Sequence, residues 1–282
     1  MAAVRVVLAF GFAAGRTDLF NLRTSRACLI SAGLFAVSIA VPEPFRYALW
    51  AIGIAHESNA LLTEDREAMQ RARRERDFAA VTPEDPREAL DAHHFAERFG
   101  LFLIILLGEV VVEAGQASAA EHIGTAGAWA ALGAAMILAA ALWWLYFDAA
   151  AEINLQVLQL SGGSTSMARA IFAVGHMLPA FGLLVTAAGV GLLLEEEPPD
   201  IAPWLACVGA GIYLAGTRGF QRNVRARRSF ARVAIVIATF FLGRLEPALG
   251  PRGFLWLLTG WVVMCAVLAH YDGRSARRSI NR

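Results

Sequence analysis

Several ionisable side chains lie inside long apolar stretches of this chain, and their chemistry is its most distinctive feature. They include Glu57, Glu109, Glu113 and His176. A charged side chain deep in hydrocarbon costs at least ~2.5–3.5 kcal/mol, so such groups usually face a bundle interior or a wet cavity. The pattern predicts a polar interior within a bundle of membrane-crossing helices.

Glu109 and Glu113 are four residues apart, which places both carboxylates on one face of a helix. Two carboxylates this close repel each other when both are ionised, which favours a bound proton or cation. The functional interpretation is therefore a protonatable or cation-binding pair. The alternative is that Glu113 is solvated at the outer interface while Glu109 pairs with Arg244.

His56 and Glu57 lie near the middle of another apolar stretch, and His176 lies about 12 Å into its own, at 1.5 Å per residue. Pro179 follows His176 and displaces the carbonyl of Gly175, which predicts a kink. A kinked helix beside a histidine, with a carboxylate at similar depth, predicts a protonatable centre. The alternative is a structural hydrogen bond between Glu57 and His176.

Arg98 shares a helix face with Glu109, but about 16 Å of helix separates them. Arg98 therefore needs a partner elsewhere, and Asp148 lies at a comparable depth near the end of the next apolar stretch. We expect a cross-helix ion pair between Arg98 and Asp148. The alternatives are that Arg98 pairs with Glu97 or extends to the interface.

Composition places the chain among membrane proteins. It has 282 residues, of which 57% are hydrophobic and 17% charged, whereas soluble domains average about 25% charged residues. The three cysteines have no CxxC spacing and the histidines do not cluster, so neither a metal nor another cofactor nor a catalytic group is indicated. Acidic residues interrupt the basic ones, which argues against nucleic-acid binding.

The apolar stretches predict an all-α fold, a polytopic transmembrane bundle of about nine spans, because about 20 apolar helical residues cross a bilayer. The expected spans are residues 4–14, 27–41, 45–62, 95–114, 127–148, 168–194, 204–217, 229–242 and 254–270. We expect one membrane domain over residues 1–282, with a charged cytoplasmic loop at 63–92. The Trp143, Trp144 and Tyr146 side chains are most simply an aromatic belt at the interface.

Arginine distribution predicts the orientation. With nine spans, the arginine-rich segments 15–26, 63–92, 218–228 and the carboxyl-terminal tail all fall on one side. The opposite loops hold Arg46, Arg244, Arg252 and the acidic run 195–200. Because positive loops stay in the cytoplasm, we expect the amino terminus outside and the carboxyl terminus in the cytoplasm.

Three stretches resemble the bacterial low temperature requirement A (LtrA) family. They begin with His94-Phe-Ala-Glu97-Arg98-Phe-Gly, with Trp143-Trp144-Leu-Tyr146-Phe-Asp148 and with Gly175-His176-Met-Leu-Pro179. The resemblance implies a polytopic bacterial inner-membrane protein, in a family named for growth in the cold and without a settled biochemical activity. The family's acidic-aromatic opening segment is absent, so we expect the usual amino-terminal helices to be missing.

These observations favour a transporter or channel that passes protons or small ions through the polar site, with the lipid bilayer as its surroundings. One alternative is a structural or regulatory membrane protein linked to cold adaptation. A further alternative is a membrane-embedded enzyme that uses His56, Glu57, Glu109 and His176 as ligands or acid–base groups. An enzyme predicts that at least three such groups converge on one point, whereas a structural role predicts that every charge is paired.

Overall fold

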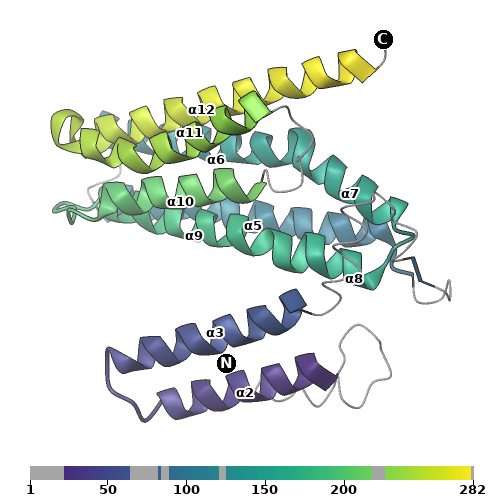
Figure 1. Cartoon of the computed structure of the whole chain (residues 1–282). Helices are drawn as coiled ribbons and strands as arrows, with labels where there is room; N and C mark the ends of the chain where they lie inside the picture. Colours follow the sequence, from purple (N-terminus) through teal and green to yellow (C-terminus); the bar gives the residue numbers. More distant parts are fainter. Residues whose placement is uncertain (1–21, 64–81, 84–88, 121–124, 218–225, 281–282) are drawn as a thin grey trace. The chain divides into compact units, whose positions relative to one another are not determined.

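The computed structural model of the chain contains helices and no strand among the residues it describes, which are 22–63, 82–83, 89–120, 125–217 and 226–280 (Figure 1). These residues divide between two compact units. The first unit combines residues 1–91 with 158–174, and the second combines 92–157 with 175–282. The expected span 4–14 and most of the loop 63–92 lie outside the described residues.

The first unit is built on a hairpin of two helices, α2 (Leu22–Ser38) and α3 (Phe45–Thr63). Its later segment contains α8 (Thr165–Ala168) and the π-helical turn η4 (Arg169–Val174). The backbone N–H of Leu90 donates to the carbonyl of Gly163 at 2.9 Å, which attaches the chain before residue 91 to this segment. Gly163 has φ +74° and a Cβ there would overlap Leu90, so both conformation and space require glycine.

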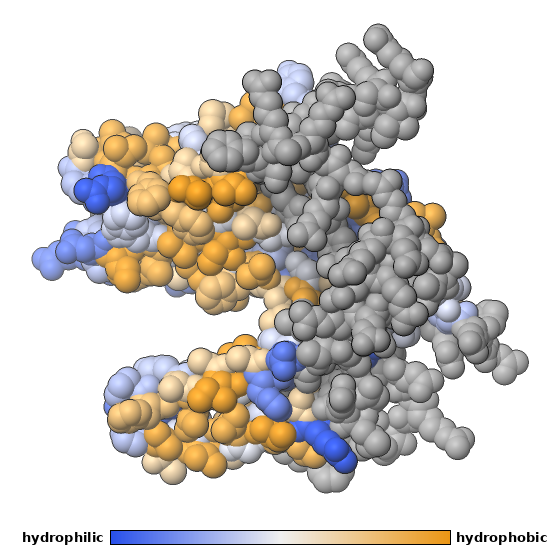
Figure 2. Space-filling view, in the orientation of Figure 1, coloured by the Kyte–Doolittle hydropathy of each residue, from blue (hydrophilic) through white to orange (hydrophobic). Residues whose placement is uncertain are grey.

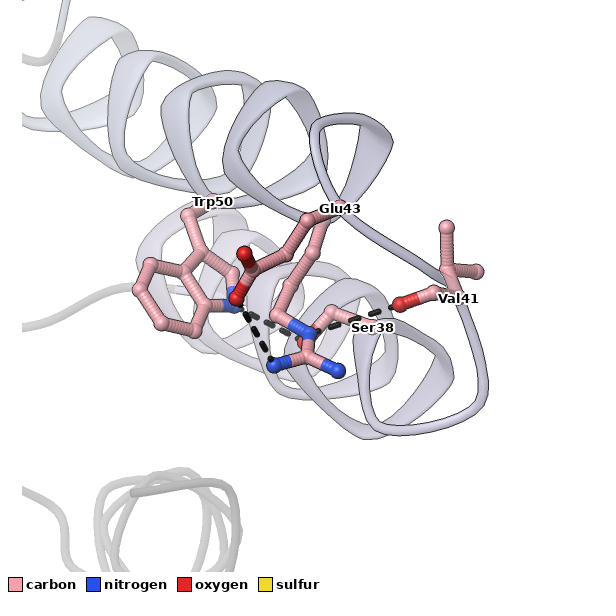
Figure 3. A network of polar contacts seen from close by, with 5 residues as sticks. Ser38, Val41, Glu43 and Trp50 are labelled. Atoms are coloured by element: carbon pink, nitrogen blue, oxygen red, sulfur yellow. Dashed lines mark hydrogen bonds and ion pairs between the residues drawn. The ribbon is translucent and has the colours of Figure 1, made fainter.

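Side-chain hydrogen bonds fix the turn between α2 and α3 (Figure 3). The indole N–H of Trp50 donates to Ser38 Oγ at 2.8 Å. The Arg46 guanidinium donates to the carbonyl of Val41 at 3.3 Å and lies 3.5 Å from a carboxylate oxygen of Glu43. These bonds join the end of α2 and the turn to the first residues of α3.

The second unit is a helical bundle. Its helices are α5 (Ala92–Ala120), α6 (Ala126–Leu145), α7 (Ala151–Leu160), α9 (Gly175–Leu193), α10 (Ala202–Thr217), α11 (Ala226–Phe241) and α12 (Glu246–Ile280). A π-helical turn, η3 (Tyr146–Ala150), joins α6 to α7, and a 3-10 turn, η5 (Leu242–Leu245), joins α11 to α12. The helices enclose an apolar core drawn mainly from leucine, alanine and valine.

Glycines allow α9 and α10 to pack backbone against backbone. A Cβ on Gly189 would overlap the backbone nitrogen of Ala206, and a Cβ on Gly209 would overlap that of Thr186. A Cβ on Gly182 would lie 2.6 Å from the backbone nitrogen of Tyr213. Small residues at such contacts are how helices in membranes approach closely.

Contacts between helices show their directions. The start of α5 meets the start of α9, where Phe99 lies against His176, and Glu113 later on α5 meets Gly191 later on α9, so the two run parallel. Helices α6 and α12 are also parallel, because Ala134 of α6 bonds to Thr259 of α12, and Asp148 of the following turn η3 bonds to His270 later on α12.

The structure confirms an all-α architecture but not about nine spans. Among the residues that the structure describes, three helical runs are long and apolar enough to cross a membrane, by length and composition: Ala126–Leu160, Thr165–Leu193 and Val233–Tyr271. The last run includes η5 and the break at Gly250, where φ is 68°. Helices α2, α10 and α11 have 17, 16 and 16 residues, fewer than the ~20 that a bilayer core needs.

Large apolar side chains are exposed along the outer faces of the helices. In the second unit they include Leu101, Phe102, Ile104 and Ile105 of α5, Met177, Leu178, Phe181 and Leu184 of α9, and Trp256, Met264 and Leu268 of α12. Figure 2 shows apolar residues along the part of the helices that is in view and hydrophilic residues at the end where the α9–α10 loop lies. Extended apolar surface of this kind is suited to contact with lipid chains.

The α9–α10 contact predicts the effect of a single methyl group. Gly209→Ala should destabilise the protein by about 1–3 kcal/mol, because the new Cβ meets backbone that cannot move aside. Gly133→Ala in α6 is the matched control, since nothing lies within 4 Å of a Cβ there. Thermal unfolding midpoints in detergent should fall for the first variant and stay equal or rise for the second. Equal midpoints for both variants would contradict the close packing.

Candidate functional site

Tyr146 and His176 form a hydrogen bond inside the second unit. The Tyr146 hydroxyl and His176 Nε2 are 2.6 Å apart, and the two residues are only 2% and 4% exposed. The side chain of Asn154 is a further hydrogen-bond partner of Tyr146. The ring of Phe99 covers His176, with centroids 5.4 Å apart. Two groups that can each donate or accept a proton therefore share one bond in a dry environment.

The π-helical turn η3 positions the tyrosine. The backbone N–H of Ala151 bonds to the carbonyl of Tyr146, five residues earlier, which defines the wider turn. The N–H of Tyr146 is shared between the carbonyls of Leu142 and Trp143. The hydroxyl of Tyr213 on α10 also donates to the Leu142 carbonyl, at 2.8 Å. Single π turns inside α-helices occur frequently at functional sites.

His176 is the second residue of α9, and the proline that follows it lies inside this helix. The preceding π-helical turn η4 gives way to α9 at Gly175, four residues before Pro179. In a regular α-helix, the ring of Pro179 would clash with the carbonyl of Gly175, and the π-helical turn ends next to this residue. Gly216 of α10 lies against Pro179, where a Cβ would be 2.6 Å from the proline Cδ. This contact holds the first turns of α9, and with them His176, against α10.

Asp148 pairs with His270 in place of the expected Arg98. His270 Nδ1 on α12 lies 3.0 Å and 3.1 Å from the two carboxylate oxygens of Asp148. The Arg98 Nε instead donates to His94 Nε2, one turn earlier on α5, at 3.0 Å. Depth alone suggested the Arg98–Asp148 pair, but Asp148 points from η3 toward α12, and both Arg98 and its neighbour Glu97 are exposed.

Glu109 and Glu113 are both half-buried on α5. The carboxylate of Glu113 lies over Gly191, where a Cβ would be 2.7 Å from Oε2. Within the described part of the chain, Glu109 makes no ion pair with Arg244, the partner expected in the alternative interpretation. Gly191 is fifteen residues beyond His176, so about 22 Å of helix separates the two polar levels.

The core between these two levels is apolar. On α5 it consists of Leu103, Leu106, Leu107 and Val110, and on α9 of Leu183, Ala187 and Val190. Each of these residues is at most 9% exposed. The carboxylates of α5 and the Tyr146–His176 pair are thus distinct sites in this structure.

Glu57 lies in the first unit, where it faces α2. The thiol of Cys28 is 3.7 Å from Glu57 Oε1, and the hydroxyl of Ser31 donates to the carbonyl of Gly53 at 2.9 Å. The neighbouring His56 is exposed. Because Glu57 and His176 belong to different units, the contact expected between them stays a prediction.

The sequence alone does not identify three of the hydrogen-bonding residues in the second unit. It predicts an aromatic belt that includes Tyr146, and it gives no reason to select Asn154 or His270. The signal for Tyr146 was chemical, because a tyrosine within an apolar helix needs a partner for its hydroxyl. No group of three or more His, Cys, Asp or Glu side chains that could hold a metal occurs among the residues described.

Comparison with known proteins places the chain in a family. The family model described as bacterial low temperature requirement A protein (LtrA) matches residues 1–269. An uncharacterized protein of Rhizobium meliloti (strain 1021) is 30% identical over 143 residues, which cover 49% of this chain and 34% of that protein. The chain thus spans about a third of the length of this relative. No solved structure matches the chain. Because the family model covers nearly the whole sequence, the chain belongs to the bacterial low temperature requirement A family.

Proposed function

We propose that this protein moves protons or small cations across the bacterial inner membrane, with the Tyr146–His176 pair as its protonatable site. The observation that carries the proposal is the 2.6 Å hydrogen bond between these two buried side chains. Histidine is the side chain whose charge changes most readily near neutral pH. A tyrosine hydroxyl bonded to it supplies a partner that can donate or accept the proton.

The positions of the polar groups favour a carrier over an open pore. Glu113 and His176 stand at two levels of the same bundle, and leucines and valines fill the core between them. Water does not enter an apolar core readily, so passage needs a change of conformation. The π-helical turn η3 and the proline in α9 are places where helices of the second unit can change their hydrogen bonding.

Glu109, Glu113 and Glu57 are proposed as further stations for the transported ion. The carboxylates of α5 would serve the outer level, with the amino terminus outside and the carboxyl terminus in the cytoplasm. Glu57, which contacts Cys28 in the first unit, would be a separate station. A carboxylate inside a membrane costs free energy of insertion, and this cost is the physical reason to expect a function for it.

Removing the shared hydrogen bond should stop the flux. In proteoliposomes that contain a pH-sensitive dye, Tyr146→Phe and His176→Gln should each lower proton flux by roughly a hundredfold, the scale of a lost proton-transfer group. Thr259→Val is the control, because it removes another buried hydroxyl, which bonds to the carbonyl of Ala134 and contacts neither Tyr146 nor His176. The control should keep its flux.

Two results would count against this proposal. Wild-type protein that conducts neither protons nor alkali cations would leave a structural or regulatory role, the alternative in which the Tyr146–His176 bond only stabilises the bundle. Equal losses in Tyr146→Phe and Thr259→Val would mean that the Tyr146 hydroxyl acts through stability alone.

The carboxylate of the first unit gives a separate prediction. Glu57→Gln should abolish flux while expression and membrane insertion stay normal, because the amide keeps the shape of the side chain but cannot carry the proton. Glu43→Gln is the control, since it removes an exposed carboxylate that pairs with Arg46 at the turn of the same hairpin. Flux through Glu57→Gln equal to wild type would remove Glu57 from the pathway.

The proposed orientation can be tested by labelling introduced cysteines. The native cysteines Cys28, Cys207 and Cys265 are buried and should not react with an impermeant maleimide. Ser275→Cys should react only in inverted vesicles and Glu196→Cys only in right-side-out cells, because the arginine-rich tail is expected in the cytoplasm and the acidic loop outside. Labelling of both cysteines from the same side would refute this topology.

A further inference from the structure

Three consecutive residues of η3 contact three different helices of the second unit. Tyr146 bonds to His176 on α9. The ring of Phe147 lies on Gly100 of α5, where a Cβ would be 3.3 Å from the ring. Asp148 bonds to a histidine on α12. One π-helical turn therefore joins α9, α5 and α12, and any rotation of this turn changes all three contacts together.

The Asp148–His270 contact is a defined geometry at a half-exposed position. His270 Nδ1 lies within 3.1 Å of both carboxylate oxygens, and the His270 and Asp148 side chains are 24% and 32% exposed. The ring of Trp144, one turn before Asp148, meets the imidazole edge at a centroid distance of 5.5 Å. A bond this exposed adds little stability by itself. The Asp148–His270 bond matters because it sets the position of the η3 backbone.

We propose that His270 is a positioning residue, which acts through Asp148 to hold η3 in the register that brings Tyr146 to His176. The inference rests on the proposed function, because it assigns the control of the same proton site. His270 and Asp148 touch neither the Tyr146 hydroxyl nor His176. They hold η3 against α12, whereas Tyr146 contacts α9.

The backbone of η3 gives the physical reason that such a restraint is needed. A π turn contains an extra residue and is rare compared with the α-helix. At the start of the turn, the N–H of Tyr146 is divided between the carbonyls of Leu142 and Trp143, so no single hydrogen bond holds the backbone there. Without the Asp148–His270 bond, η3 can relax toward the α-helical pattern. Each residue of register shift turns a side chain by about 100° around the helix, which would carry the Tyr146 hydroxyl away from His176.

The chemical accessibility of His176 tests this inference without any measurement of flux. Full-length protein in detergent is treated with diethyl pyrocarbonate, and modification of His176 is followed by peptide mass spectrometry. Wild-type His176 should react slowly, because it is buried and hydrogen-bonded. His270→Leu should raise its rate of modification roughly two- to fivefold, the scale of a partly exposed ion pair that no longer holds the closed arrangement.

Two further variants separate positioning from general stability. His270→Asn keeps an N–H donor near the place of Nδ1 and should return the rate for His176 close to the wild-type value. Thr259→Val removes another hydrogen bond between the same two helices, the 3.2 Å bond from Thr259 to the carbonyl of Ala134, far from η3. The Thr259→Val variant should leave His176 protected even where its unfolding midpoint falls as far as that of His270→Leu.

The outcomes are distinguishable from those of the transport assay. Unchanged protection of His176 in His270→Leu, or equal loss of protection in Thr259→Val, would overturn the inference even if the protein transports protons. Selective exposure of His176 with no flux in wild type would support the positioning role and refute transport. If His270→Leu does not fold, Asp148→Asn replaces it, and a rise in modification that is smaller but selective is expected. No rise in that variant would also overturn the proposal.

Discussion

A polar side chain inside an apolar helical bundle has no water to bond, so its partner must come from another part of the chain, and this constraint organises the second unit. Tyr146 hydrogen-bonds to His176, Tyr213 donates to the carbonyl of Leu142, and Thr259 donates to the carbonyl of Ala134. Each bond joins two helices. Together they hold the apolar helices at fixed axial positions, which nonspecific contact between leucines and alanines would not do alone.

The close approach of α9 and α10 sets the position of His176. Because glycines let the two backbones touch, α9 cannot slide along α10 without overlap between Gly189 and Ala206 or between Gly209 and Thr186. The same register places Gly216 on Pro179, near the start of α9. A histidine three residues before that proline is then held at the level of η3. Packing by small residues thus decides the geometry of a polar site that contains none of them.

In the first unit, polar side chains of one helix of the hairpin bond to the other helix. Trp50 and Ser38 bond near the turn, Ser31 and Gly53 bond further along, and the Cys28 thiol meets the Glu57 carboxylate. A thiol is a weak hydrogen-bond donor.

Hydrophobicity and the chemistry of single residues could be read from the sequence, and both concern local properties. Apolar stretches predicted helices at 45–62, 95–114, 127–148 and 204–217, and helices α3, α5, α6 and α10 lie there. The sequence motifs also indicated the family, which the family model confirms. Local properties of the sequence do not determine which polar side chains contact one another. Arg98 and Asp148 have matching depths, yet Asp148 bonds to His270, 122 residues later, because the π turn η3 rotates it toward α12. Depth follows from counting residues along one helix, whereas partners depend on the rotation and register of two helices, which only their packing decides.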